Sequence, residues 1–458
     1  MTKKLPLNCL LAAALFFGFG GTSHLSLQAA NTLESSSEIV FGEGDYEEIR
    51  FTVDGLYYVA VSDTEVAVDS ETEEGYNEGN APSGDIVVPS TVEWNGKTYN
   101  VVAVSPSAFS ANDNISSVTF NEGIIVISEF AFMGCSNLDT IKLPSSLIAI
   151  GPGAFYFCSA LNYLTIPEGV TEIPMFCFGA CSNLLNISLP NSLKKIDMQA
   201  FYACSAMESI VIPEGVEEIG DATFFACAGL SKIQLPASLQ TLGVNAFYYC
   251  TNISEFSTTE QNTKFSTENG VLFNKDKSLL IAYPPAKDAS EYTVPASVKE
   301  INSLAFANAT NLSKIVIPNG VEKVSAMAFS NCTNLERIHF PASVTSLGRN
   351  LFENCGMLAE IHVAWGDPLD IGEEVFEELP IFNMHLYVPE GTESIYMTTE
   401  VWKRFGGVFA DEIVDGIHTT TLAPATRSVY DLDGRPATLN GKGVRLIREN
   451  GKVRKVIL

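Results

Sequence analysis

The chain has 458 residues, and 54 acidic side chains against 27 basic ones give it a formal charge of −27. An acidic excess of this size repels phosphate, which disfavours nucleic-acid binding by the main body and electrostatic attachment to anionic membranes. The segment from Arg427 onward differs, since its eight Lys and Arg outnumber three Asp and Glu and leave −32 on the rest.

Residues 1–30 have the pattern of a signal peptide. Lys3 and Lys4 form a basic start, an apolar run extends over 10–17, and small residues follow at 28–30. No later apolar run is long enough to span a bilayer. The sequence therefore predicts an exported protein, at the cell surface or extracellular, with the periplasm as the alternative.

Residues 31–105 are predicted to form a β-rich N-terminal cap and a degenerate first rung of a repeat. Asp54-Gly55 lies between apolar residues and is typical of a hairpin turn. The degenerate rung begins at 86–89 and continues through Trp94 to Tyr99.

An internal repeat of 23 residues governs the segment 106–365. Three residue types recur with this spacing. The phenylalanine column is Phe109, Phe132, Phe155, Phe178, Phe201, Phe224, Phe247, Phe306, Phe329 and Phe352. The cysteine column is Cys135, Cys158, Cys181, Cys204, Cys227, Cys250, Cys332 and Cys355. The proline column is Pro144, Pro167, Pro190, Pro213, Pro236, Pro318 and Pro341. A period between 20 and 50 residues indicates a solenoid or a related array.

One rung can be read from its residue pattern. Leu164 and Ile166 alternate with a polar residue, which predicts a short strand that buries one face. Pro167 lacks an N–H and ends that strand. Phe155 and Cys158 are three apart, as on the inward face of a helical turn. The predicted fold is an α/β solenoid of leucine-rich repeat type, with short strands, a helical turn in each rung and ten or eleven rungs.

The repeat is interrupted once and ends before the C-terminus. An insertion near 257–290 is predicted to contain a β-hairpin with residues 274–277 at its tip. Residues 366–415 are predicted to be a C-terminal cap, in which Trp402 and Phe405 cover the open end of the core. Residues 416–458 form a basic tail with short alternating strands.

The cysteine column is interpreted as structural. Asn112 and Ala309 occupy the same repeat position, which indicates a need for a small buried side chain and not for a bond. Parallel side chains in a ladder also fail to converge as metal ligands must. We therefore predict free thiols, with no metal site and no cofactor.

Two columns are candidate binding surfaces. The first points outward from the strands, and its ligand-face residues are Thr140, Lys142, Tyr163, Thr165, Asn186, Ser188, Lys232 and Gln234. The second is an aromatic stripe beside the phenylalanine column, formed by Tyr156, Tyr202, Phe225 and Tyr248. For the stripe, packing between rungs is the preferred interpretation and partner binding is the alternative.

His339 and His362 are one period apart, so they are predicted to be neighbours on adjacent rungs. A stacked histidine pair suits a metal or a pH switch, but no carboxylate or cysteine is evident nearby in the sequence. Two solvated strand residues are the preferred interpretation. The sequence also lacks the common nucleophile, zinc-protease and phosphate-loop motifs, so no catalytic residues are assigned and an enzyme is not expected.

The pattern Ala-Phe-x-x-Cys, followed by Leu-x-x-Ile-x-Ile/Leu-Pro and Val-x-x-Ile, resembles the BspA-like leucine-rich repeat family of bacterial surface proteins over residues 86–365. The resemblance implies adhesion to host matrix or plasma proteins, such as fibronectin and fibrinogen, or to other microbes. A structural envelope scaffold and a carbohydrate-binding protein are the alternatives. The tail, with Tyr430-Asp431 and Gly434-Arg435, resembles a sorting domain of the type IX secretion system of Bacteroidetes.

Overall fold

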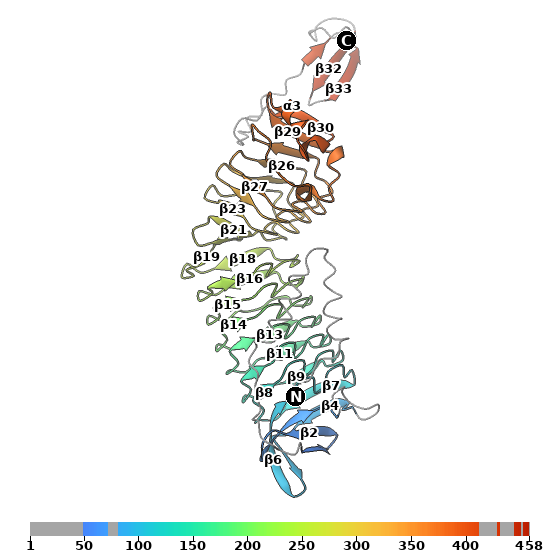
Figure 1. Ribbon diagram of the computed structural model, residues 1–458, viewed down its shortest axis with the longest axis vertical. Coiled ribbons are helices and arrows are strands. Elements are labelled where there is room, and N and C mark those ends of the chain that lie inside the picture. Colours follow the sequence, from blue (N-terminus) through green and yellow to red (C-terminus); the bar gives the residue numbers. More distant parts are fainter. Residues whose placement is uncertain (1–48, 72–80, 412–427, 431–443, 450–451, 458) are drawn as a thin grey trace.

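The computed structural model describes residues 49–71, 81–411, 428–430, 444–449 and 452–457. Residues 49–71 and 81–411 form an elongated stack of about 13 coils (Figure 1). This exceeds the ten or eleven rungs counted from the sequence, because the segment after residue 365 continues the stack. The ring of Phe376, for example, lies 6.3 Å from that of Phe352. The expected signal peptide lies outside the described residues.

Parallel strands form one side of the stack, which we call the strand face. The strands of its first sheet pair in the order β13-β11-β9-β7-β4. Their bounds are β4 Gly84–Val88, β7 Ile115–Phe120, β9 Thr140–Lys142, β11 Tyr163–Thr165 and β13 Asn186–Ser188. A short sheet follows, with β16 Lys232–Leu235 and β18 Glu255–Thr258. A six-stranded sheet completes the face, with β22 Glu291–Thr293, β24 Lys314–Val316, β26 Arg337–Phe340, β28 Glu360–Val363, β29 His385–Pro389 and β30 Gly407–Asp411.

Shorter strands form a second side. Four of them pair in parallel as β12-β14-β15-β17. Their bounds are β12 Glu172–Ile173, β14 Lys195–Ile196, β15 Glu218–Ile219 and β17 Thr241–Leu242. Beyond the insertion the second side continues with β23 Glu300–Ile301, β25 Lys323–Val324 and β27 Ser346–Leu347. Five of these strands bury their apolar second residue and leave the polar first one more exposed, while Leu242 in β17 and Leu347 in β27 are partly buried.

The N-terminal part contains a seven-stranded sheet that merges into this second side. Its strands are β1 Arg50–Val53, β2 Leu56–Ala60, β3 Glu65–Asp69, β5 Thr91–Trp94, β6 Lys97–Val104, β8 Val126–Ile127 and β10 Ala149–Ile150. The hairpin predicted at Asp54-Gly55 joins β1 to β2, and both turn residues have positive φ.

The insertion and the C-terminal part add the remaining elements. The predicted hairpin is present as β20 Val271–Asn274 and β21 Leu279–Ala282, with β19 Phe265–Glu268 as a third strand. The short helices are η1 Glu373–Phe376, η2 Ile381–Asn383, α3 Glu393–Tyr396 and η3 Trp402–Arg404. The tail contributes the antiparallel strands β31 Ser428–Tyr430, β32 Val444–Glu449 and β33 Lys452–Ile457. The limits assigned to the caps and the tail stay predictions.

Turns form the third side, where the sequence predicted a helical turn in each rung. In the rung of Phe201, the amides of Ala200 and Tyr202 donate to carbonyls three residues back. The amide of Phe201 between them donates to the carbonyl of Thr223 in the next rung (3.0 Å). Gln199 and Ala203 adopt left-handed φ values of 54° and 55°. Left-handed residues interrupt a helix, so the expectation of a helical turn, and with it the α/β assignment, is corrected to a turn ladder.

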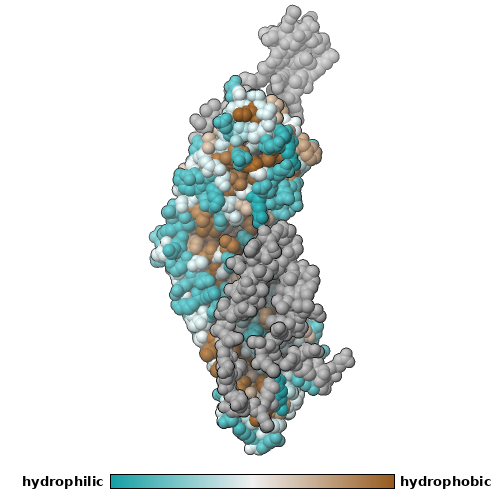
Figure 2. Space-filling view, viewed as in Figure 1, coloured by the Kyte–Doolittle hydropathy of each residue, from teal (hydrophilic) through white to brown (hydrophobic). Residues whose placement is uncertain are grey.

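The core runs along the stack behind these three sides. Rings of the phenylalanine column stack on one another, with centroids 5.7 Å apart between Phe178 and Phe201 and 5.6 Å between Phe201 and Phe224. Tyr283 occupies the column position one period before Phe306 and stacks on it at 5.3 Å. The buried residues form two main clusters that meet at the hairpin, one from Phe51 to Leu272 and one from Val271 to Phe405. Apolar residues also lie in patches along the visible surface, between hydrophilic flanks (Figure 2).

Carboxylates tie neighbouring rungs together at the turn after the strand face. Glu168 accepts the backbone N–H groups of Asn191 (3.1 Å) and Ser192 (3.2 Å). The Ser192 hydroxyl donates to the Val170 carbonyl at 2.8 Å, and it accepts the N–H of Gly169. The backbone donors, Asn191 first, hold the pKa of Glu168 below its usual value. Glutamate in one rung and serine in the next thus form a two-rung unit.

The cysteine column consists of free, buried thiols. The Sγ of Cys181 donates to the carbonyl of Phe155 at 3.2 Å, and Cys204 makes the same contact with Phe178 at 3.1 Å. Eight members of the column share this geometry, so a thiol satisfies a buried carbonyl in rung after rung. The prediction of free thiols within the repeat is confirmed.

We expect these thiols to resist alkylation in the native protein. Burial raises the pKa of Cys181 to about 12, so at pH 8 only about one molecule in ten thousand carries its reactive thiolate. Iodoacetamide labelling at pH 8, followed by peptide mass spectrometry, should modify none of the nine described cysteines before guanidinium is added and all of them afterwards. Labelling of Cys204 in the folded protein at the denatured rate would contradict the buried ladder.

Candidate functional site

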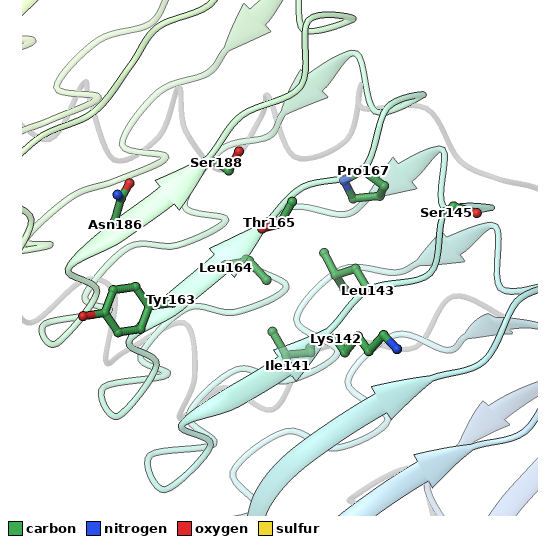
Figure 3. Close-up of a pocket in the computed structure, with 10 residues that line it drawn as sticks. All are labelled: Ile141, Lys142, Leu143, Ser145, Tyr163, Leu164, Thr165, Pro167, Asn186 and Ser188. Carbon is green, nitrogen blue, oxygen red and sulfur yellow. The ribbon is translucent and has the colours of Figure 1, made fainter.

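A shallow groove of about 460 Å³ lies on the strand face over β9, β11 and β13. The strands place side chains alternately, so Ile141 and Leu164 point into the core while Lys142 and Tyr163 point to solvent. The residues that line the groove are Ile141, Lys142, Leu143, Ser145, Tyr163, Leu164, Thr165, Pro167, Asn186 and Ser188 (Figure 3).

The structure brings most of the predicted ligand-face residues together here. Five of the eight line the groove: Lys142, Tyr163, Thr165, Asn186 and Ser188. Thr140 is paired with Tyr163 on the adjacent strand. Lys232 and Gln234 lie outside the groove on β16, two rungs beyond β13, and the rung between these strands, at 207–212, forms no strand.

Five lining residues are not among the predicted ligand-face residues. Ile141 and Leu164 were expected to point inward, and Leu143, Ser145 and Pro167 lie within three residues after a strand. The proline column could have indicated Pro167, since a residue that ends a strand also borders the outward surface of that strand. That the predicted face binds a ligand stays a prediction.

Lys142 distinguishes the groove electrostatically. Six other lysines of the solenoid form ion pairs with carboxylates one rung away, whereas Lys275 and Lys287 of the insertion donate to backbone carbonyls. The six pairs are Lys194–Glu217, Lys195–Glu172, Lys232–Glu255, Lys299–Glu322, Lys314–Glu291 and Lys323–Glu300. Within the described part of the chain, no carboxylate lies at ion-pair distance from Lys142. Its partner in register on β7 is Thr119, which explains the missing charge. The groove thus presents an uncompensated cation in an acidic protein.

Tyr163 supplies the exposed aromatic surface of the groove, with 63% of the residue accessible. Its strand β11 is hydrogen-bonded to β9 on one side and to β13 on the other. The middle strand of the floor therefore has no free backbone edge, although β13 is the last strand of its sheet. The side chains of the groove offer one cation, one aromatic ring, an amide and several hydroxyls.

The aromatic stripe packs more closely than an open binding surface would. Tyr202 and Phe225 stack with centroids 5.3 Å apart, and Phe225 meets Tyr248 edge-on at 5.4 Å. Tyr248 is buried. Tyr156 covers Gly179, where an added Cβ would lie 2.9 Å from the ring. Burial raises the pKa of Tyr156 to about 12, with a smaller contribution from Tyr202. These contacts favour packing between rungs, the preferred interpretation from the sequence.

The histidines lie as the repeat predicts, with His339 and His362 paired in register. The expectation that no carboxylate is near is wrong, because Nδ1 of His362 lies 2.7 Å from Oδ2 of Asp411 on β30. The His362 ring also stacks on Tyr387 at 4.4 Å. His385 pairs with Glu360 and does not continue the histidine column. These contacts anchor the last strand of the cap.

A second, polar cavity of about 430 Å³ lies where the hairpin interrupts the strand face. Its lining comprises Ser254, Glu255, Phe256, Ser257, Thr267, Asn269, Gly270 and Lys287. The ammonium of Lys287 already donates to the carbonyl of Asn269 at 2.7 Å, so this cavity has less unused binding capacity than the groove.

Two general features of the described residues bear on function. No group of three or more His, Cys, Asp and Glu side chains is arranged there to hold a metal ion. Among the same residues, no helix has the length and apolar character needed to cross a membrane.

Comparisons with known proteins agree with the repeat architecture. The family model of the BspA type leucine rich repeat region matches residues 102–206, 171–269 and 285–398, more than half of the chain. No curated protein is similar enough to count as a relative.

Two solved structures show the same fold. The pneumococcal vaccine antigen PcpA is 20% identical, with a TM-score of 0.50, and the alignment covers 80% of this chain and 99% of that one. A leucine rich cell surface protein of Faecalibacterium prausnitzii is 18% identical, with a TM-score of 0.51, and the alignment covers 80% and 96%.

Proposed function

This chain belongs to the BspA type leucine rich repeat family. We propose that it is a surface-displayed adhesin that binds host matrix or plasma proteins, or other microbes. The groove on the strand face carries the proposal, since it gathers five ligand-face residues around an uncompensated cation and an exposed tyrosine. In this mechanism the partner is held by noncovalent contacts spread over several rungs, and no covalent bond is made or broken.

Rigidity supports such a role. Stacked rungs with continuous ladders keep the side chains of β9, β11 and β13 at fixed spacing, which lowers the entropy lost when a partner binds. Export by residues 1–30 and sorting by the tail belong to the same proposal. Both segments lie wholly or partly outside the described residues.

Binding of the purified protein to immobilised fibronectin, fibrinogen, collagen and mucin tests the proposal. The double variant Tyr163→Ala/Asn186→Ala removes exposed groove side chains, and Val211→Ala is the matched control because Val211 is 81% exposed on the same side, outside the groove. We expect saturable binding that the double variant weakens at least tenfold, as for central contacts of an interface, and the control leaves unchanged. Binding that both variants leave intact would place the partner site elsewhere.

Protease treatment of intact cells tests display at the surface. We expect added protease to remove the protein from cells. Complete protection of the chain would favour the alternative of an envelope scaffold without a host ligand.

A further inference from the structure

The groove's side chains suit a particular class of ligand. Tyr163 and Asn186 lie at one end, and the Lys142 side chain extends toward the other end, where Ser145 lies (Figure 3). Thr165 and Ser188 lie between them on adjacent strands. These strands are three residues long, so the floor is about 10 Å in length at about 3.3 Å per residue.

The groove offers a peptide neither strand pairing at β11 nor a deep side-chain pocket. Strand addition needs a free sheet edge, and β11 is hydrogen-bonded on both sides. Anchoring by a side chain needs an enclosed apolar pocket, whereas the core residues under the groove, Ile141 and Leu164, are each only 5% exposed. Hydroxyl and amide groups on an open surface match a ligand that is itself rich in hydroxyl groups.

The positive charge of Lys142 narrows the class of ligand further. The ammonium of Lys142 has no carboxylate of the described chain at ion-pair distance, although the protein carries a net charge of −27. A ligand carboxylate is the complement that this position lacks. The exposed ring of Tyr163 provides a flat apolar surface, on which the C–H face of a pyranose packs as apolar groups pack on aromatic rings.

We propose that the groove over β9, β11 and β13 binds a carboxylated saccharide, with its carboxylate at Lys142 and a pyranose ring on Tyr163. Asn186, Thr165 and Ser188 hydrogen-bond the sugar hydroxyls between these two points. Tyr163 is paired with Thr140, so Lys142 lies one strand across and two residues along, about 8 Å away at the backbone, a separation that suits a disaccharide. This inference rests on the proposed function, because it names the glycan chains of a surface glycoprotein as the part of the partner that the same face holds.

Isothermal titration of the purified full chain at low and moderate salt provides the test. The probes are digalacturonic acid, sialyllactose and, as the neutral control, lactose, so uronic and sialic acids are distinguished. We expect one of the two acidic sugars to bind at least fivefold more tightly than lactose. Lys142→Gln should remove that preference, a loss of about fivefold as expected for an exposed ion pair. Tyr163→Ala should weaken both acidic and neutral sugars by about tenfold.

Lys314→Gln is the matched control, since Lys314 lies on β24 of the strand face, outside the groove, and is paired with Glu291 at 3.3 Å. It should leave every affinity unchanged. Equal binding of lactose and the acidic sugars, or an acidic preference that survives Lys142→Gln, would overturn the inference. Binding of an aspartate-rich peptide in place of any sugar would overturn it as well. If sugars fail while a matrix protein binds and loses affinity in Tyr163→Ala/Asn186→Ala, the saccharide inference falls and the adhesin proposal stands.

Discussion

Replacing Phe201 with alanine should lower the free energy of unfolding by about 3–5 kcal/mol. Phe201 is buried and lies between the rings of Phe178 and Phe224, at 5.7 and 5.6 Å. The substitution opens a cavity in the middle of a continuous column, and the neighbouring rungs cannot close around it because the turn ladder fixes their spacing. Equilibrium denaturation in guanidinium, followed by circular dichroism, measures the loss.

Val211→Ala is the control for Phe201→Ala, because a side chain with 81% exposure should change stability by less than about 0.5 kcal/mol. Hydrogen exchange locates the effect. The loosened amides should lie in the half of the chain between Phe51 and Leu272, since Phe201 belongs to that core cluster. A loss below about 1 kcal/mol for Phe201→Ala would mean that the ring column does not carry the core.

Replacing Trp402 with alanine should also cost about 3–5 kcal/mol, and it should make the protein self-associate. Trp402 is fully buried over the last rungs, with ring centroids 5.7 Å from Phe376 and 5.8 Å from Trp365. Its Nε1 donates to the carbonyl of Leu369 at 2.8 Å. Loss of this lid exposes the end of an apolar stack, and an uncapped solenoid end is a surface for another copy.

Denaturation and light scattering after size exclusion measure the two consequences. Phe382→Ala is the matched control, because Phe382 belongs to the same cap and is 68% exposed. In Trp402→Ala, amides of the cluster between Val271 and Phe405 should exchange faster, while those of the cluster between Phe51 and Leu272 should exchange as before. A Trp402→Ala protein that stays monomeric with unchanged stability would show that the cap is dispensable.

Several features could be predicted because residues that are one repeat apart in the sequence become neighbours on adjacent rungs. Residues 23 apart occupy adjacent rungs, so His339 and His362 lie in register as the spacing required. The same spacing places Tyr283 one period before Phe306, although the predicted column contains phenylalanine alone. The alternation of Glu168-Gly169 with Asn191-Ser192 was equally visible, but reading every rung as equivalent hid the two-rung unit.

The helical turn was wrongly predicted for a definite physical reason. A spacing of three, as between Phe201 and Cys204, is common to helices and to successive turns. The groups that decide between them come from another rung, because the carbonyl of Thr223 takes the Phe201 amide that a helix would use internally. No local pattern contains that information.

Periodicity and alternation in the amino-acid sequence were enough to predict the stack, its period, its core columns, its free thiols and the outward direction of Lys142 and Tyr163. These follow from alternation and periodicity, which are properties of neighbouring residues. Three features became evident from the folded chain alone: the groove over β9, β11 and β13, the absence at Lys142 of the ion pair that six other lysines make, and the contact of Asp411 with His362. Grooves and ion pairs depend on side chains from several rungs at once, so they form only when the rungs are stacked.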